Sequence, residues 1–125
     1  MCFHYALTKE KAEIEIQLGV NWDDEWQPVF HADGFTFLQM PKKKKKQPGR
    51  VQLFNWGLIP HWVKTRADAG KLKAQTLNAR SETVFEKPSF RSYIPNNRCL
   101  VIADGFFEWM KKKKKKYPHF IQMKD

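Results

Sequence analysis

The chain of 125 residues is long enough for one domain with a buried core, and its 42% hydrophobic and 14% aromatic content excludes a disordered segment. The formal net charge of +10 points to an anionic partner, but five lysines at residues 42–46 and six at residues 111–116 supply most of it, leaving 12 basic against 13 acidic residues elsewhere. Two cysteines without a CxxC spacing exclude a disulfide framework and a zinc ribbon, and no apolar run reaches the roughly 18 residues of a membrane span.

A helix is predicted over residues 8–19, with Thr8 as its N-cap and Gly19 as its stop. Lys11 stands three positions after Thr8, where a capping box would need Glu, so the box is absent. Ala12 and Ile16 lie along one stripe of this helix, and we expect that stripe to face the core. A polar, tryptophan-bearing connection follows at residues 21–27.

Each lysine run interrupts a pattern that predicts a β-hairpin. Residues 35–40 and 51–56 flank the first run, and residues 106–110 and 117–121 flank the second. Blocks of like charge repel and stay solvated. We interpret the runs as mobile hairpin tips or as stand-ins for residues that were not identified; a basic DNA-binding tract is the alternative.

The segment between the two hairpins begins with a turn at residues 57–60. A short helix is predicted from residue 61 to 67, ending by Gly70, and helical turns are predicted at residues 81–85 and 90–93. Residues 98–103 form the strongest strand pattern, apolar on both faces, which predicts a central strand.

The predicted fold is α+β and mostly β: a strongly bent or barrel-like mixed sheet with flanking helices. It forms a single domain over residues 1–125. The chain ends on a strand pattern, residues 120–125, without a following partner, so we expect the sequence to be the N-terminal part of a longer domain. The start of the chain lacks the pattern of a secretion signal, and a monomer in the reducing cytoplasm is expected.

Cys2 is the first candidate for chemistry. If Met1 is removed, Cys2 carries a free α-amine, with a pKa near 7.7–8.0, and a thiol, with a pKa near 8.5. The amine can form a Schiff base with an aldehyde, and the thiol can close on the same carbon to give a five-membered thiazolidine. The alternative is a small apolar side chain near a frayed terminus.

Three further groups contain candidate side chains. Asn78 can orient a nucleophile without acting as a base, and Arg80 presents a planar fork suited to phosphate; the alternative is a helix entry with a surface arginine. Glu108 lies among aromatic residues, where a carboxylate can serve as a general acid–base; the alternative is an exposed hairpin residue. Trp56 and Trp62 flank a turn and can stack on bases or belong to the core. No histidine has a second ligand at metal-binding spacing, so no metal is predicted.

These groups in this order resemble the SOS response-associated peptidase family, also called the abasic-site processing family. The resemblance rests on Cys2 after Met1, on residues 56–62 (WGLIPHW), on residues 78–83 (NARSET) and on residues 98–109 (RCLVIADGFFEW). It runs over essentially the whole chain, and the last two motifs are highly specific.

The resemblance implies a protein that binds single-stranded DNA containing an abasic site and forms a thiazolidine cross-link through its N-terminal cysteine. It implies that Cys2 is the nucleophile, that Asn78 orients Cys2 and the sugar, that Arg80 holds phosphate and that Glu108 assists proton transfers. Trp56 and Trp62 would contact DNA, and no cofactor is implied.

Two departures from the family pattern stand out. Members often follow the cysteine with Gly-Arg, where this chain has Phe3 and His4. The family also uses a histidine in its C-terminal portion, beyond Asp125, and His119 falls in the wrong place to replace it. Two competing hypotheses are an N-terminal-nucleophile peptidase or amidohydrolase using Cys2, including removal of its own Met1, and a plain nucleic-acid-binding module that relies on the lysine runs.

Overall fold

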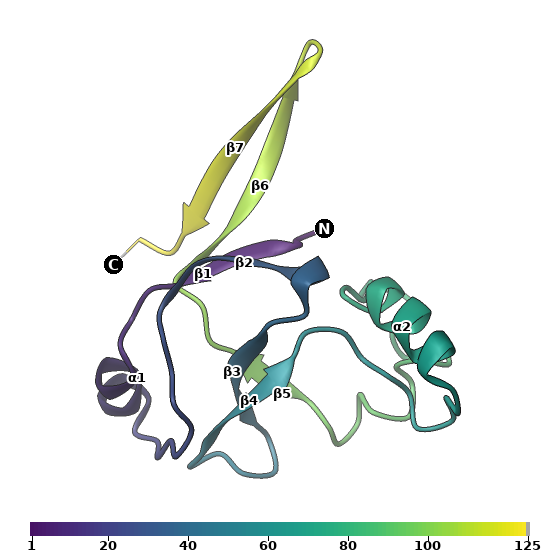
Figure 1. The fold of residues 1–125 in the computed structure, drawn as a ribbon, viewed down its shortest axis with the longest axis horizontal. Coiled ribbons are helices and arrows are strands. Elements are labelled where there is room, and N and C mark those ends of the chain that lie inside the picture. The colour runs from purple at the N-terminus through teal and green to yellow at the C-terminus, as the bar shows by residue number, and fades with distance from the viewer. Residues whose placement is uncertain (125) are drawn as a thin grey trace.

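The computed structural model describes residues 1–124 and contains two antiparallel sheets with a helix at either side (Figure 1). The strands are β1 (His4–Leu7), β2 (Val29–Asp33), β3 (Gln39–Lys44), β4 (Val51–Asn55), β5 (Cys99–Val101), β6 (Gly105–Lys112) and β7 (Lys115–Gln122), and the helices are α1 (Lys11–Leu18), the 3-10 turn Gly34–Thr36 and α2 (Arg66–Gln75).

The first sheet has the strand order β2-β1-β6-β7. β6 and β7 form a long hairpin that rises away from the rest of the molecule (Figure 1). Its ladder runs from Gly105 opposite Gln122 to Lys112 opposite Lys115, so only Lys113 and Lys114 form the turn. The predicted second hairpin is therefore confirmed, but four of the six lysines lie in its strands instead of a loose tip.

The second sheet has the order β4-β3-β5 and packs near the core. Leu7, Ile14, Met40 and Val51 are almost completely buried, together with Trp22 and other apolar side chains. The first lysine run also enters a strand, because β3 continues through Lys44. Lys42 donates to the carbonyl oxygen of Asn55, and the ammonium groups of Lys42 and Lys44 lie 5.9 and 5.0 Å from the centre of the Phe54 ring.

Several local expectations are wrong in detail. Helix α1 begins after Glu10, whose backbone N–H donates to the Glu13 carboxylate, while Thr8 is bonded to Asp104. Ile14 is the buried residue of this helix, and Ile16 is 84% exposed. The stop at Gly19 is confirmed by its left-handed conformation. Further along, the predicted short helix before Gly70 is replaced by α2. This helix begins after Thr65, whose side chain accepts from the backbone N–H of Asp68, and it continues through Gly70.

The sheet arrangement also corrects the expected fold. A single bent or barrel-like mixed sheet is not observed, because the seven described strands divide into two open sheets and every strand pair is antiparallel. β5 is an edge strand and not a central one, with Leu100 67% and Val101 52% exposed. The mostly β composition with flanking helices is as predicted. Within residues 1–124, no helix is both long and apolar enough to cross a membrane.

Candidate functional site

The N-terminus lies beside β6 because β1 pairs with it. Tyr5 is opposite Phe106 and Ala6 is opposite Gly105 in this antiparallel ladder. Residues before Tyr5 therefore extend along β6 in the direction of Glu108. The α-ammonium of Met1 lies 3.6 Å from Oε1 of Glu108. The pairing of two strands distant in sequence thus brings the Met1–Cys2 peptide and a half-buried carboxylate together.

The environment of Cys2 favours the protonated thiol. Burial raises the pKa of Cys2, and the negative charge of Glu108 raises it further. Sγ donates a hydrogen bond of 3.2 Å to the carbonyl oxygen of His4. The His4 backbone and the nearby N-terminal charge lower the pKa, but the net shift is upward. Cys2 is a free, half-buried cysteine. A mostly protonated thiol at neutral pH suits a reaction in which the amine acts first.

A cavity of about 360 Å³ lies between the N-terminus and the segment that follows α2. Met1, Asn78 and Arg80 all line it, with Lys87 as a second cation. Nδ2 of Asn78 is buried and has no hydrogen-bond partner among the described residues. A buried amide donor without a partner is costly, so this group is available to a bound molecule.

The chain before Asn78 is fixed by hydrogen bonds from two side chains. Oγ1 of the buried Thr76 donates to the carbonyl oxygen of Leu58, 2.6 Å away. Nε1 of Trp56 donates to the carbonyl oxygen of Leu77, 2.8 Å away, and the Trp56 ring packs against Tyr5 with centroids 5.2 Å apart. Trp56 thus connects the segment before Asn78 to Tyr5 of β1.

The two tryptophan candidates differ in their surroundings. Trp56 is partly buried against the core, which favours the core interpretation of that residue. Trp62 is 47% exposed and is not among the residues that line the cavity. It follows His61, whose backbone N–H and ring both contact the hydroxyl of Tyr93. The structure brings Asn78, Arg80 and Glu108 to the N-terminus and leaves Trp62 on a neighbouring surface.

Three residues of this region were not among the candidates chosen from the sequence. Thr76 stands just before the Asn78 motif and Lys87 follows it, and only the folded chain shows that both line the cavity. His119 lies directly opposite Glu108 in the β6–β7 ladder, a position that correct pairing of the hairpin could have revealed. Within the described part of the chain, no three acidic, histidine or cysteine side chains gather in a way that could hold a metal ion.

The sequence of the chain is similar to those of known proteins. The profile of the family described as SOS response associated peptidase (SRAP) matches residues 1–125. The abasic site processing protein YoqW of Bacillus subtilis is 42% identical over 129 residues, which cover 99% of this chain and 55% of YoqW. The abasic site processing protein HMCES of Rattus norvegicus is 44% identical over 69 residues, covering 53% of this chain and 19% of HMCES.

Solved structures show the same backbone arrangement. A crystal structure from Bacteroides thetaiotaomicron superposes with a TM-score of 0.92 at 38% identity, covering 99% of this chain and 55% of that one. A structure from Bordetella bronchiseptica shares the fold, with a TM-score of 0.74 at 22% identity over 94% of this chain and 55% of that one. The chain thus spans about half the length of the relatives that it matches from end to end.

Proposed function

The chain belongs to the SOS response associated peptidase (SRAP) family, and we propose that it recognises abasic sites in single-stranded DNA and binds them covalently through Cys2. The names of the relatives, abasic site processing proteins, support the lesion as the target. The observation that carries the proposal is the position of the N-terminus, which lies 3.6 Å from the Glu108 carboxylate and lines one cavity with Asn78 and Arg80.

The proposed reaction starts after Met1 is removed. The free α-amine of Cys2 attacks the aldehyde carbon of the ring-opened abasic sugar, and the aldehyde oxygen leaves as water to give a Schiff base. The thiol sulfur then adds to the same carbon while its proton passes to the nitrogen, which closes a thiazolidine. One water is released in total, and no oxidant or reductant is needed.

Each neighbouring side chain has a role in this proposal that fits its chemistry. Glu108 accepts a proton from the attacking amine and returns it to the departing oxygen. The unpartnered Nδ2 of Asn78 donates to an oxygen of the sugar and so orients it. Arg80 and Lys87 attract the flanking phosphates to the cavity.

A second activity is supported by the contact between the Met1 ammonium and Glu108. The Cys2 thiol can attack the Met1 carbonyl carbon, which transfers the Met1 acyl group from nitrogen to sulfur. Water then cleaves the thioester, releasing methionine and leaving the free amine and thiol of Cys2. The peptidase hypothesis thus becomes a maturation step of the same site.

The test incubates the purified chain with a single-stranded oligonucleotide that contains one abasic site, followed by a denaturing gel and intact mass measurement. We expect a heat-stable adduct on chains that have lost Met1, with the mass of protein plus DNA minus one water. Cys2→Ala should form no stable adduct, and Cys2→Ser should form at most a labile one because an oxazolidine reopens readily. Asn78→Ala should lower the rate of adduct formation by roughly tenfold to a thousandfold, the usual range for a lost positioning or donor group.

The matched control is Cys99→Ser, which removes the other, exposed thiol. Its adduct yield should equal that of the parent chain. A full yield of stable adduct from Cys2→Ala, or a stable adduct on chains that retain Met1, would show that the linkage is not the proposed thiazolidine.

A further inference from the structure

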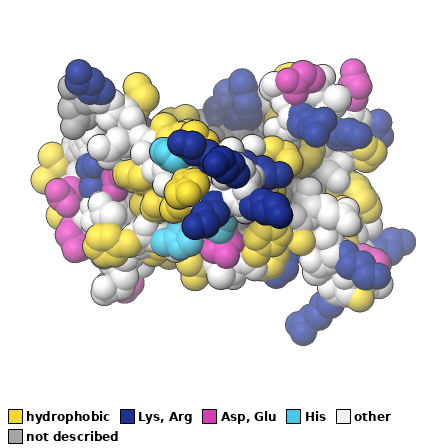
Figure 2. Space-filling view, turned by 90° about the horizontal axis from the view of Figure 1, so that it is seen from above, with side chains coloured by type: hydrophobic (Ala, Val, Ile, Leu, Met, Phe, Trp, Pro, Cys, Tyr) yellow, Lys and Arg dark blue, Asp and Glu magenta, His cyan; other side chains and the backbone are white. Residues whose placement is uncertain are grey.

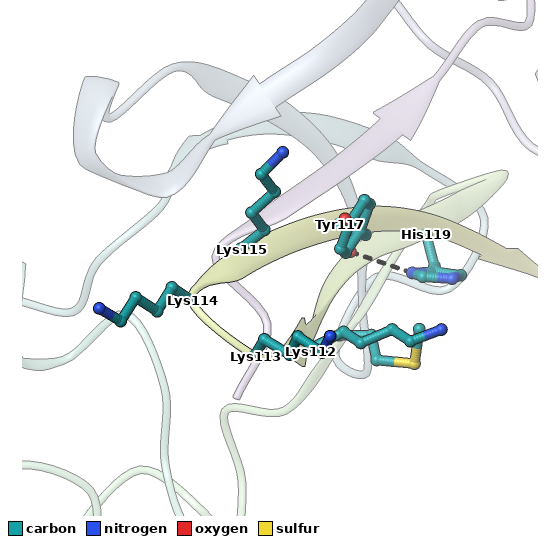
Figure 3. A pocket seen from close by; sticks show the side chains of 7 residues that line it. Lys112, Lys113, Lys114, Lys115, Tyr117 and His119 are labelled. Carbon is teal, nitrogen blue, oxygen red and sulfur yellow. Dashed lines mark hydrogen bonds between the residues drawn. The ribbon is translucent and has the colours of Figure 1, made fainter.

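One face of the β6–β7 hairpin continues outward from the candidate site. Side chains alternate between the two faces of a strand, and residues opposite each other in the ladder share a face. Glu108 is opposite His119, followed by Met110 opposite Tyr117 and Lys112 opposite Lys115. The side chains after Glu108 line a shallow pocket of about 840 Å³ together with the turn lysines (Figure 3).

This face changes character in steps along the hairpin. A carboxylate and an imidazole come first, then a methionine and an aromatic ring, and finally a pair of ammonium groups. Tyr117 is 44% and Met110 52% exposed, so both present apolar surface to solvent. Nδ1 of His119 lies 3.0 Å from the carbonyl oxygen of Tyr117, which holds the imidazole beside the tyrosine (Figure 3).

The two lysine runs differ in what surrounds them. Lys42 and Lys44 lie over the Phe54 ring, and burial lowers the pKa of Lys42. Lys111 to Lys116 are exposed, and among residues 1–124 no carboxylate forms an ion pair with them. Seen from above, basic side chains gather on one face of the molecule beside histidine and apolar ones (Figure 2). The second run therefore keeps its charge available to a partner.

We propose that the hairpin face formed by Met110, Lys112, Lys115 and Tyr117 binds the DNA strand on one side of the lesion. Tyr117, supported by Met110, stacks on a base, and Lys112 and Lys115 contact the phosphates. Stacking on an aromatic ring combined with basic groups along the backbone is how proteins bind single strands without reading their sequence. The inference rests on the proposed function, because that function places the abasic site beside Glu108, at the base of this face.

The dimensions of the hairpin fit a short stretch of single strand. Lys112 lies four residues beyond Glu108, or about 13 Å at the rise of a β-strand. That distance corresponds to roughly four stacked nucleotides at about 3.4 Å each. Substitution of the lysines should therefore weaken the binding of oligonucleotides that extend several nucleotides from the lesion position, and should not change the binding of shorter ones.

The test measures equilibrium binding of abasic-free single-stranded DNA over a range of salt concentrations. It uses the full chain carrying Cys2→Ala, so that the result does not depend on the covalent reaction. The double variant Lys112→Ala/Lys115→Ala should bind more weakly. The negative slope of log affinity against log salt should become shallower by about 1.4, or about 0.7 for each lost phosphate contact. Tyr117→Ala should weaken binding by about tenfold, whereas Tyr117→Phe, which keeps the ring, should bind like the parent.

The matched control is Lys111→Ala/Lys116→Ala, the neighbouring cross-strand pair on the opposite face, which removes the same charge. It should change the slope by clearly less than the Lys112/Lys115 pair does. Binding to polyglutamate, a polyanion without bases, is measured in parallel. The proposal would be overturned by equal effects of the two double variants, by equal losses of binding to polyglutamate and to DNA, or by parent-like binding of Tyr117→Ala. Absence of adduct from the chain with an intact Cys2 would instead count against the covalent function, whatever the binding results.

Discussion

At the scale of single residues, the chemistry proposed for the site depends on two groups of Cys2, its α-amine and its thiol. In the chain that still carries Met1, burial and then the Glu108 charge raise the pKa of the Cys2 thiol, so little thiolate is present at neutral pH. An α-amine has a pKa near 7.7–8.0 and is partly unprotonated under the same conditions. The proposed order, amine first and sulfur second, fits this environment, in which the Glu108 charge disfavours the thiolate.

We predict that Glu108→Gln lowers the pKa of the Cys2 thiol, because the substitution removes a negative charge that disfavours the thiolate. The rate of alkylation by iodoacetamide against pH reports this pKa, and its midpoint should move to lower pH. The measurement uses Cys99→Ser chains with the same N-terminus, verified by intact mass. Glu82→Gln, at an exposed position, is the matched control and should leave the midpoint in place. An unchanged or raised midpoint in Glu108→Gln would contradict the electrostatic account.

At the scale of elements, the sequence predicts where strands form better than it predicts which strands pair. The hairpin of β6 and β7 was predictable because alternating side chains and a short connection restrict how adjacent strands pair. The position of β5 at the edge of its sheet was not predictable. An apolar strand pattern indicates that its side chains favour burial, but it does not indicate which strand lies beside it. The start of α1 was missed for a related reason: Thr8 contacts Asp104, 96 residues away, so it cannot cap the helix.

Gly105 fixes the base of the hairpin that carries Glu108. A Cβ atom at this position would lie 2.5 Å from the carbonyl oxygen of Ile121 and 2.6 Å from a ring carbon of Phe120. We predict that Gly105→Ala lowers the free energy of unfolding by about 1–3 kcal/mol, as overpacking commonly does. Thermal or urea unfolding measures this change. Gly49→Ala, where no atom lies within 4 Å of the added methyl group, should change stability by much less, and similar losses in the two variants would contradict the packing argument.

At the scale of the whole molecule, the site exists only because distant parts of the chain meet. Motif residues near positions 78 and 108 could be nominated from the sequence, since their residue types suit the chemistry. Lys87 and Thr76 could not, because their contribution depends on how the segment after α2 folds against the N-terminus. A similar long-range contact holds β1 against the start of β6, through Asp104 and the residues that follow β1.

Asp104 makes this contact through its carboxylate. Its oxygens accept from the backbone N–H and hydroxyl of Thr8, at 2.6 and 2.7 Å, and from the Lys9 ammonium, at 3.0 Å. Burial alone would raise the pKa of Asp104, but these hydrogen bonds and the Lys9 charge outweigh it and lower the pKa. The ionised carboxylate is thus the form that the folded chain favours.

Stability should therefore depend on pH through Asp104. A carboxyl group with a lower pKa in the folded chain adds stability above its unfolded pKa of about 3.9, and that contribution is lost as the pH falls through the folded value. We predict that Asp104→Asn lowers the free energy of unfolding at pH 7 by about 1–3 kcal/mol. The amide NH2 group of Asn would face the donor groups of Thr8 and Lys9, so these hydrogen bonds could not all form. Urea unfolding from pH 7 down to pH 3 should show the parent and variant curves converging below about pH 4. Asp24→Asn, at an exposed position, is the control and should follow the parent throughout. A constant difference between parent and Asp104→Asn at every pH would mean that the side chain acts through its shape and not through its charge.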